Sequence, residues 1–253
     1  MPRYFIEVAY RGTAYSGFQV QANAVTIQSE VERVLQILLR ERVSLTGSSR
    51  TDAGVHALQN FFHLDLLQPI DSRARDLHEL TYKLNALLPQ DIVVKRVVVV
   101  GSDRHCRFDA VSRDYLYRIY RFKDPFLEGR GYYFPYPVNR ERMQQAAGLV
   151  RGVTDFTAFA KRNTQVRNFE CTVFESRWIF RDNGMIYRVS ANRFLRGMVR
   201  ALTATMLRVG REKMDLGDFR AVLEGRDNQD ACFAAPAAGL FLKQVNFPPG
   251  YFG

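Results

Sequence analysis

The fold of this chain is decided by the stretch Thr26-Ile27-Gln28-Ser29-Glu30-Val31-Glu32-Arg33-Val34-Leu35-Gln36-Ile37-Leu38-Leu39-Arg40. Apolar residues recur here every three or four positions, the spacing that places side chains on one face of a helix. That stripe consists of Ile27, Val31, Val34, Leu35 and Leu38. Thr26 precedes it and is a residue type that caps helix N-termini. The stretch therefore predicts an amphipathic helix over 26–40.

The segments on either side of this helix alternate between strand and helix patterns. Short apolar or alternating runs predict strands over 4–8, 43–45, 59–66 and 92–100. A second helix is predicted over 76–88, where Pro89 stops it. The run over 92–100 is almost entirely β-branched and predicts a buried strand. The resulting order, β-α-β-β-α-β, is typical of a ferredoxin-like unit.

The second half of the chain repeats this order. Residues 105–122 are predicted to be extended, with a break near Ser112, and 140–150 to be helical. Strands over 169–180 and 185–190 flank the hairpin signal Asp182-Asn183-Gly184. Helices over 194–209 (ended by Gly210) and 216–223, and a strand over 240–247, complete the half. We therefore expect an α+β fold of two ferredoxin-like halves, 1–103 and 104–253, sharing a mostly antiparallel sheet with a central cleft.

Composition and charge indicate what kind of molecule the protein binds and in which cellular compartment it is expected. The 253 residues include 36 Lys and Arg against 26 Asp and Glu, so the net charge is +10. This excess favours a polyanionic partner such as RNA, although a solvated basic surface is the alternative. The three cysteines form no C-x-x-C pair, which indicates neither a disulfide framework nor a zinc site. A short, charged N-terminus and the lack of a long apolar run predict a soluble cytoplasmic protein with no membrane segment.

The densest chemical signal is the loop segment Gly47-Ser48-Ser49-Arg50-Thr51-Asp52-Ala53-Gly54-Val55-His56-Ala57, between two predicted strands. Its residue types have two interpretations. Short polar residues and glycine build tight turns, in which Asp52 would bond nearby backbone amides. Alternatively, Asp52 is a carboxylate held at a loop tip and kept ionised by a nearby arginine, ready to act as a nucleophile or base.

This loop resembles the active-site loop of TruA-type tRNA pseudouridine synthases, and five further blocks resemble the family in the same order. The blocks are Tyr10 to Gln21 with Thr26-Ile27-Gln28, Arg113-Asp114-Tyr115-Leu116-Tyr117-Arg118-Ile119, Asp155-Phe156-Thr157-Ala158-Phe159, Ala191 to Arg200, and Ala234 to Leu242. They cover essentially the whole chain. Three positions depart from the family pattern, namely Arg11, Ser49 and Gly197, and they bear on RNA contacts and loop rigidity.

The resemblance implies a role for each matching residue. Asp52 would attack the target uridine at the ribose C1′ or at the base C6, after which the uracil rotates and C5 joins the sugar. Tyr115 would stack on the flipped uracil and assist removal of the C5 proton, and Arg200 would pair with Asp52. Arg50 would support the flipped conformation or fill the vacated space, and Leu240 would form an apolar wall of the uracil pocket. This isomerisation needs no cofactor and no metal.

The family also implies the substrate: uridines of the tRNA anticodon arm, at positions thirty-eight to forty, bound by a homodimer. Cations that flank the blocks are candidates for phosphate contacts. They are Arg104, Arg107, Arg113, Lys161, Arg162, Arg167, Arg193 and Arg196. Two other classes of protein remain as alternatives. A non-catalytic RNA-binding protein would use the basic and aromatic residues alone, and a small-molecule enzyme would act on free nucleotides.

Overall fold

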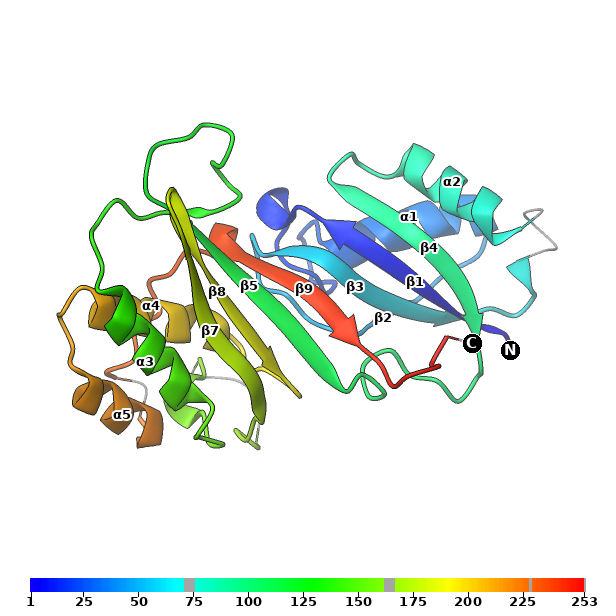
Figure 1. Cartoon of the computed structure of the whole chain (residues 1–253). Coiled ribbons are helices and arrows are strands. Elements are labelled where there is room, and N and C mark those ends of the chain that lie inside the picture. The colour runs from blue at the N-terminus through cyan, green and yellow to red at the C-terminus, as the bar shows by residue number, and fades with distance from the viewer. Residues whose placement is uncertain (71–75, 162–166, 228, 253) are drawn as a thin grey trace. The chain divides into compact units, whose positions relative to one another are not determined.

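The computed structural model describes residues 1–70, 76–161, 167–227 and 229–252. The chain forms two compact units (Figure 1). Unit 1 comprises Met1–Val111 with Leu242–Gly253, and unit 2 comprises Ser112–Phe241. Residues 104–111 and 242–253 thus belong with the first unit rather than with the second predicted half. In the described part of the chain, no helix combines the length and apolarity needed to cross a membrane.

Unit 1 has the predicted β-α-β-β-α-β order. Its elements are β1 (Arg3–Tyr10), α1 (Ile27–Leu39), β2 (Thr46–Gly47), β3 (His56–Asp65), α2 (Leu77–Leu87) and β4 (Ile92–Val100). Strand β1 lies between β3 and β4 and pairs antiparallel with both, and β2 pairs antiparallel with the other edge of β3. The predicted strand over 43–45 is wrong by a few residues, because the pairing with β3 involves Thr46 and Gly47 instead.

Both helices of unit 1 begin at side-chain caps that the sequence provides. Thr26 Oγ1 accepts a hydrogen bond from Ser29 N at 3.1 Å, and Ser29 Oγ accepts one from Thr26 N at 2.9 Å. This reciprocal pair is a capping box, which satisfies two backbone donors that a helix start otherwise leaves unpaired. Asp76 caps α2 by accepting from Glu79 N at 2.8 Å. The predicted role of Thr26 is confirmed.

The strands of unit 1 are buried unevenly. Phe5 and Phe61 pack against aromatic rings of the C-terminal segment, with Phe61 stacked on Phe252 at a centroid distance of 5.7 Å. Strand β4, by contrast, has Val93 and Val99 exposed at 45% and 57%. The expectation of a buried strand over 92–100 is therefore wrong. Because Ile92, Val94 and Val97 face the core and their neighbours face solvent, β-branching here reflects strand propensity and not burial on both faces.

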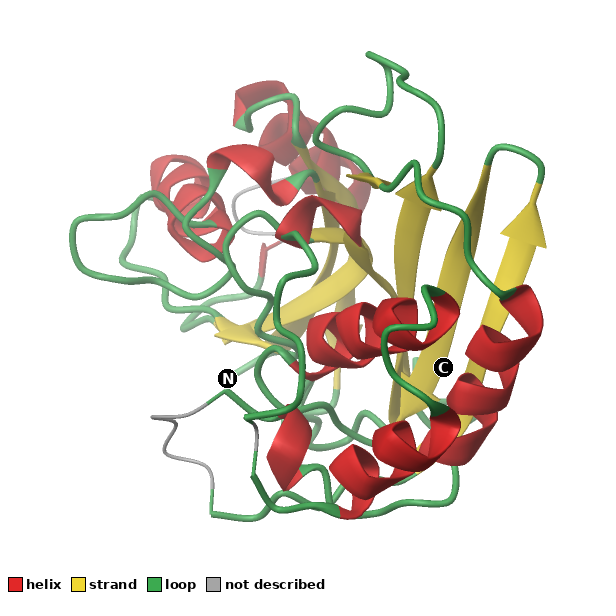
Figure 2. Ribbon diagram, turned by 90° about the vertical axis from the view of Figure 1, so that its left-hand side faces the viewer, coloured by secondary structure: helices red, strands yellow, loops and turns green. Residues whose placement is uncertain are grey.

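Unit 2 consists of β5 (Ser112–Tyr120), β6 (Tyr132–Tyr133), α3 (Arg140–Val150), β7 (Val173–Arg181), β8 (Gly184–Ala191), α4 (Met198–Gly210) and α5 (Leu216–Glu224). Strand β8 lies between β5 and β7 and pairs antiparallel with both, and the short β6 runs parallel to β5. Helices cover the strands from one side, with α3 against β7 and α4 against β5 (Figure 2). Strand β9 (Leu240–Asn246) completes the α+β fold.

Two elements of unit 2 begin later in the structure than the sequence predicts. The predicted extended segment over 105–122 becomes strand only from Ser112, as the expected break indicates. Helix α4 begins at Met198 and not at Phe194, because Gly197 adopts a left-handed conformation with a φ of 77°. Glycine adopts this region without the steric cost that a Cβ brings. The α+β class and the mostly antiparallel pairing are confirmed.

Candidate active site

The Asp52 loop, residues 48–55, connects β2 to β3 in unit 1. It is closed by a hydrogen bond from Val55 N to Asp52 O at 3.1 Å, and Gly54 supplies the positive φ of 78° that this turn requires. Thr51 is buried, whereas Asp52 is partly exposed and Arg50 is exposed. The loop thus holds its threonine inside and presents its arginine and aspartate toward the surface.

A buried polar network fixes the loop from below. Tyr10 Oη lies 2.8 Å from Thr51 Oγ1, and Asn60 Nδ2 donates to Tyr10 Oη at 3.1 Å and to Ser49 O at 2.9 Å. Ser48 Oγ donates to Asn60 Oδ1 at 2.7 Å. Asn60 is fully buried and Tyr10 is nearly so, and burial raises the pKa of the Tyr10 hydroxyl far above its usual value. The phenol therefore stays neutral and holds the residue next to Asp52 in one place.

The segment Gly12 to Phe18 fixes the loop from the side. Gly12 N donates to His56 Nδ1 at 3.1 Å, and Phe18 N donates to Thr51 O at 3.1 Å. A Cβ at Gly12 would overlap the carbonyl oxygen of Val55, so only glycine allows this approach. At Gly17, whose φ of 104° already favours glycine, a Cβ would lie 3.1 Å from Thr51 O. The resemblance block at Tyr10 to Gln21 thus has a structural purpose, which is to hold the Asp52 loop.

Two of the three departures from the family pattern have local structural consequences. Ser49 has a buried hydroxyl for which the described residues offer no hydrogen-bond partner. Glycine at this position would remove that unpaired group. At Gly197 a Cβ would lie 3.1 Å from Lys161 Cγ in a backbone conformation that L residues rarely adopt. Glycine therefore suits this local backbone.

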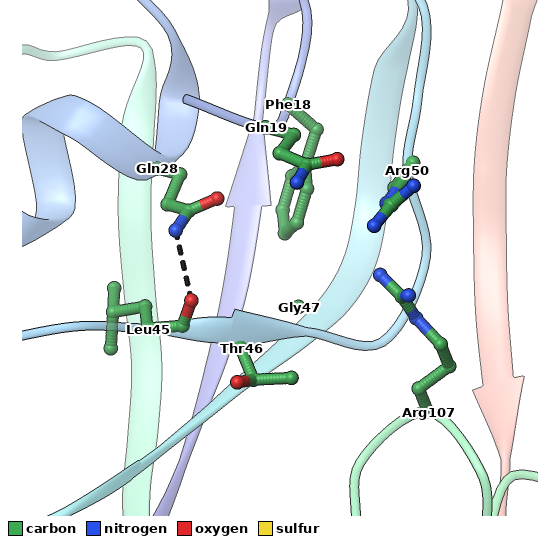
Figure 3. Close-up of a pocket in the computed structure, with 8 residues that line it drawn as sticks. All are labelled: Phe18, Gln19, Gln28, Leu45, Thr46, Gly47, Arg50 and Arg107. Carbon is green, nitrogen blue, oxygen red and sulfur yellow. Dashed lines mark hydrogen bonds between the residues drawn. The ribbon is translucent and has the colours of Figure 1, made fainter. Parts of the chain in front are cut away.

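A pocket of about 170 Å³ opens beside the loop and brings two predicted residues together. Its lining residues come from the segment before α1, from α1, from β2 and the residue before it, from the loop and from the segment after β4. They are Phe18, Gln19, Gln28, Leu45, Thr46, Gly47, Arg50 and Arg107. Figure 3 shows the guanidinium groups of Arg50 and Arg107 pointing toward one another. The pKa of Arg107 is lowered by its burial and, next, by the positive charge of Arg50. These two predicted substrate-binding residues therefore share one site.

In unit 2, the predicted uracil platform lies on β5. Tyr115 is 9% exposed, and its ring meets Phe194 edge-on at a centroid distance of 5.0 Å. Tyr117 lies on the same face of the strand, since side chains alternate with a period of two. It is fully buried, and its hydroxyl donates to Pro236 O at 2.7 Å. Tyr117 is thus a core residue that fixes the segment after Ala234.

Arg200 and Leu240 meet that same segment. Arg200, in the first turn of α4, donates from Nε to Ala235 O at 2.7 Å. A guanidinium has five N–H donors, and this bond uses one of them. Leu240 is buried at the start of β9, directly after Gly239, where a Cβ would lie 2.6 Å from the Tyr117 ring. The Ala235–Leu240 segment therefore links Tyr117, Arg200 and Leu240 within unit 2.

Sequence reasoning did not predict how the Asp52 loop is held. Tyr10, Gly12 and Gln19 lie in a block that resembles the family, and His56 lies in the loop segment, but no supporting role was assigned to them. Asn60 and Thr46 were missed, because each reads as an ordinary strand residue. Of the predicted phosphate contacts, Arg162 lies outside the described residues. Within the described ranges, no three His, Cys, Asp or Glu side chains are grouped to hold a metal.

Comparison with known proteins identifies the family of this chain. The family model described as "tRNA pseudouridine synthase" matches residues 6–109 and 146–248. A protein of Porphyromonas gingivalis named tRNA pseudouridine synthase A is 42% identical over the full length of both chains. Proteins of the same name from Parabacteroides distasonis and Staphylococcus aureus are 40% and 37% identical, over 98% and 91% of their own lengths. This chain belongs to the tRNA pseudouridine synthase family.

Proposed function

We propose that this pseudouridine synthase modifies uridines of the tRNA anticodon arm, at positions thirty-eight to forty, with Asp52 as its nucleophile. The relatives that align along the whole chain carry the name tRNA pseudouridine synthase A. The observation that carries the assignment is the placement of Asp52. It is partly exposed, while its neighbour Thr51 is held by the buried Tyr10–Asn60 network. A catalytic side chain needs such support, because its reactive atoms must be held within about 0.5 Å of the productive geometry.

The proposed reaction is an isomerisation in which nothing is gained or lost overall. A base in a stem must first leave the stack before a carboxylate can reach it. The Asp52 carboxylate then attacks C1′ of the ribose or C6 of the uracil, and the bond between C1′ and N1 breaks. The uracil rotates, C5 bonds to C1′, the C5 proton leaves, and N1 gains a proton. Asp52 is released at the end, so no oxidant, reductant or water is consumed.

The other residues have positioning and proton-transfer roles in this proposal. Tyr115 stacks on the extruded uracil and assists removal of the C5 proton. Arg200 pairs with Asp52 and keeps it ionised, with its guanidinium already oriented by the bond to Ala235 O. Leu240 forms the apolar wall of the uracil pocket. Arg50 supports the extruded conformation. Because Tyr117 and the 235–240 segment are packed together, Arg200 and Leu240 keep a fixed spacing.

The proposed partner is tRNA, bound by a homodimer in the cytoplasm. The charge of +10 supports a polyanionic partner. The dimer and the compartment rest on the family resemblance and on composition. Analytical ultracentrifugation at micromolar concentration, with and without tRNA, tests the dimer. A single monomeric species in both samples contradicts it.

Release of tritium from tRNA labelled at C5 of uridine tests the proposed activity. The proposal expects release in step with pseudouridine formation, confined to the anticodon arm, and none from free uridine nucleotides. Binding without release would leave a non-catalytic RNA-binding protein. Release from free nucleotides would indicate a small-molecule enzyme. Mapping pseudouridines in tRNA from cells with and without the gene identifies the positions.

A further inference from the structure

The pocket beside the Asp52 loop contains two like charges that face each other. Arg50 comes from the loop, and Arg107 comes from the segment that follows β4. Their guanidinium groups point toward one another across the pocket (Figure 3). The lowered pKa of Arg107, caused by burial and by Arg50, reflects that proximity. Two like charges at this spacing repel each other, and an anion bound between them would relieve that repulsion.

Arg107 is held in place by a built scaffold. Its backbone N donates to His105 Nδ1 at 3.1 Å. The preceding Cys106 donates from Sγ to Thr46 O at 3.1 Å and lies 3.2 Å from His63 Nδ1. Cys106 is fully buried, so these contacts anchor the base of Arg107 to β2 and β3. Because the backbone beside Arg107 is anchored in the core, the arginine is positioned before any ligand binds.

The remaining lining shows which groups face the pocket. Gln28 is engaged elsewhere, because its Nε2 donates to Leu45 O at 2.8 Å and to Glu32 Oε1 at 2.9 Å. Figure 3 shows the Gln19 amide on the same side of the pocket as Arg50. Phe18 closes the floor, since its ring is stacked on Phe62 at 4.6 Å and is 1% exposed. The pocket is therefore small and rich in hydrogen-bond donors, which suits an oxyanion rather than a stacked base.

We propose that Arg50 and Arg107 form a clamp for one phosphodiester group of the bound RNA. Guanidinium groups match the planar, bidentate geometry of phosphate oxygens, and two of them can share one phosphate. Arg50 is two residues from Asp52, so their Cα atoms are at most about 7 Å apart. The clamp is therefore placed to hold a phosphate close to the attacked nucleotide. The clamp rests on the proposed function for the identity of the RNA.

The clamp fixes the register of the RNA against Asp52. Phosphate contacts carry no sequence information, but they set where a nucleic acid lies on the protein. Cys106 and His63 act here as positioning residues, because they hold the Arg107 segment without lining the pocket. By holding one phosphate at a fixed place in unit 1, the clamp helps to determine which nucleotide lies beside Asp52.

A double-mutant cycle between protein and RNA tests the clamp. Anticodon-arm hairpins are prepared with one neutral methylphosphonate at each position in turn, and binding is measured with wild type and with Arg107→Gln, Arg50→Gln and Arg33→Gln. Arg33 is the matched control, since it is an exposed arginine of unit 1 paired with Glu30 on α1. Circular dichroism and Tm check that each variant is folded. If Arg107→Gln is not, Arg107→Lys and Arg50→Gln replace it.

The clamp predicts one sensitive position. Wild type loses roughly tenfold or more in affinity when that phosphate is neutralised, the size expected for hydrogen bonds to a charged group. Arg107→Gln and Arg50→Gln each lose part of that affinity with the unmodified hairpin and show a smaller further loss at that position than wild type, because the other guanidinium still contacts the phosphate. Arg107→Lys keeps the charge but not the fork, and recovers part of the loss. Arg33→Gln behaves as wild type throughout.

Several outcomes overturn the clamp. One is a cycle in which the protein and RNA changes add at every position. Another is a site for free anions, in which inorganic phosphate raises the Tm of wild type but not of Arg107→Gln while no hairpin position depends on Arg107. Tritium release by wild type is measured in parallel. Release without a sensitive phosphate refutes the clamp alone, whereas a sensitive phosphate without release refutes the proposed activity alone.

Discussion

The hydroxyl of Tyr10 lies 2.8 Å from Thr51 Oγ1, one residue before the proposed nucleophile Asp52. The same hydroxyl accepts from Asn60 Nδ2 at 3.1 Å, so a tyrosine on β1 joins the loop to β3. Each partner of this hydroxyl is buried. The position of Asp52 therefore depends on a residue with no chemical role of its own.

Tyr10→Phe should reduce turnover while the protein stays folded. The change removes the Tyr10 partner of the buried Thr51 hydroxyl and one of the two acceptors of Asn60 Nδ2, which costs about 1–3 kcal/mol. A displacement of the loop by about 1 Å can lower kcat on the order of 100-fold. Urea unfolding and single-turnover kinetics measure the two effects. Tyr4→Phe is the matched control on the same strand. The Tyr4 hydroxyl accepts a hydrogen bond from Ile70 N, so stability should fall and kcat should not. Equal kcat values for the two variants would refute the positioning role.

Gly12→Ala should destabilise the protein and disorder the Asp52 loop. The new Cβ would overlap the carbonyl oxygen of Val55, and backbone cannot move aside as a flexible side chain can. A cost of about 1–3 kcal/mol is expected. Gly148→Ala is the contrast, because a Cβ there meets nothing within 4 Å, on an exposed face of α3. It should stabilise by roughly 0.5–1 kcal/mol. Thermal unfolding of both variants tests this prediction. An unchanged Tm for Gly12→Ala would show that the loop can shift to accept the Cβ.

Tyr115→Phe and Tyr117→Phe should separate chemistry from stability. The first keeps the ring but loses the hydroxyl that assists removal of the C5 proton, so turnover should fall on the order of 100-fold or more at nearly unchanged tRNA affinity. The second loses the bond to Pro236 O, so it should cost about 1 kcal/mol of stability with a much smaller effect on turnover. Saturating enzyme in single-turnover assays removes binding from the comparison. Near-wild-type turnover of Tyr115→Phe would limit the ring to a stacking platform.

Stability should fall as the pH drops from about 6.5 toward 4. Burial, and then the charges of Arg3 and His105, lower the pKa of His63 to about 4 from 6.5. Because the unfolded chain binds this proton more readily, the free energy of unfolding decreases through that window by about 2 kcal/mol. His105, whose pKa is also lowered by burial, adds in the same direction. Urea unfolding at pH 7 and 4.5 measures the difference. This difference in the free energy of unfolding should be smaller in His63→Asn. An unchanged difference would show that groups other than His63 cause the loss of stability.

The sequence predicted most elements because each carries its own local signal. The capping residue Thr26 and the hairpin signal Asp182-Asn183-Gly184 act within a few residues, and the structure bears both out. The burial of β4 could not be predicted, since its valines look alike and only the pairing with β1 places the strand at an edge of unit 1. The loop support of Asn60 was equally hidden, because its partners Tyr10 and Ser49 are distant in sequence.

The sequence proposes residues for the candidate site but not the contacts that support them. Asp52, Arg50 and Arg107 lie in unit 1, and the last two share the pocket. Tyr115, Arg200 and Leu240 lie in unit 2, where Arg200 bonds to Ala235 O. Motifs identify side chains that touch a substrate. They do not identify Cys106 or Tyr10, whose contribution is a hydrogen bond to another part of the fold.

The most direct measurement of the central claim is single-turnover tritium release by Asp52→Asn from C5-labelled tRNA. The amide has nearly the shape of the carboxylate but is a poor nucleophile. If Asp52 attacks the uridine, the variant should bind tRNA with nearly wild-type affinity, keep the wild-type Tm, and release no tritium above the uncatalysed background. Release within about tenfold of the wild-type rate, from a folded variant that binds tRNA, would contradict a nucleophilic Asp52.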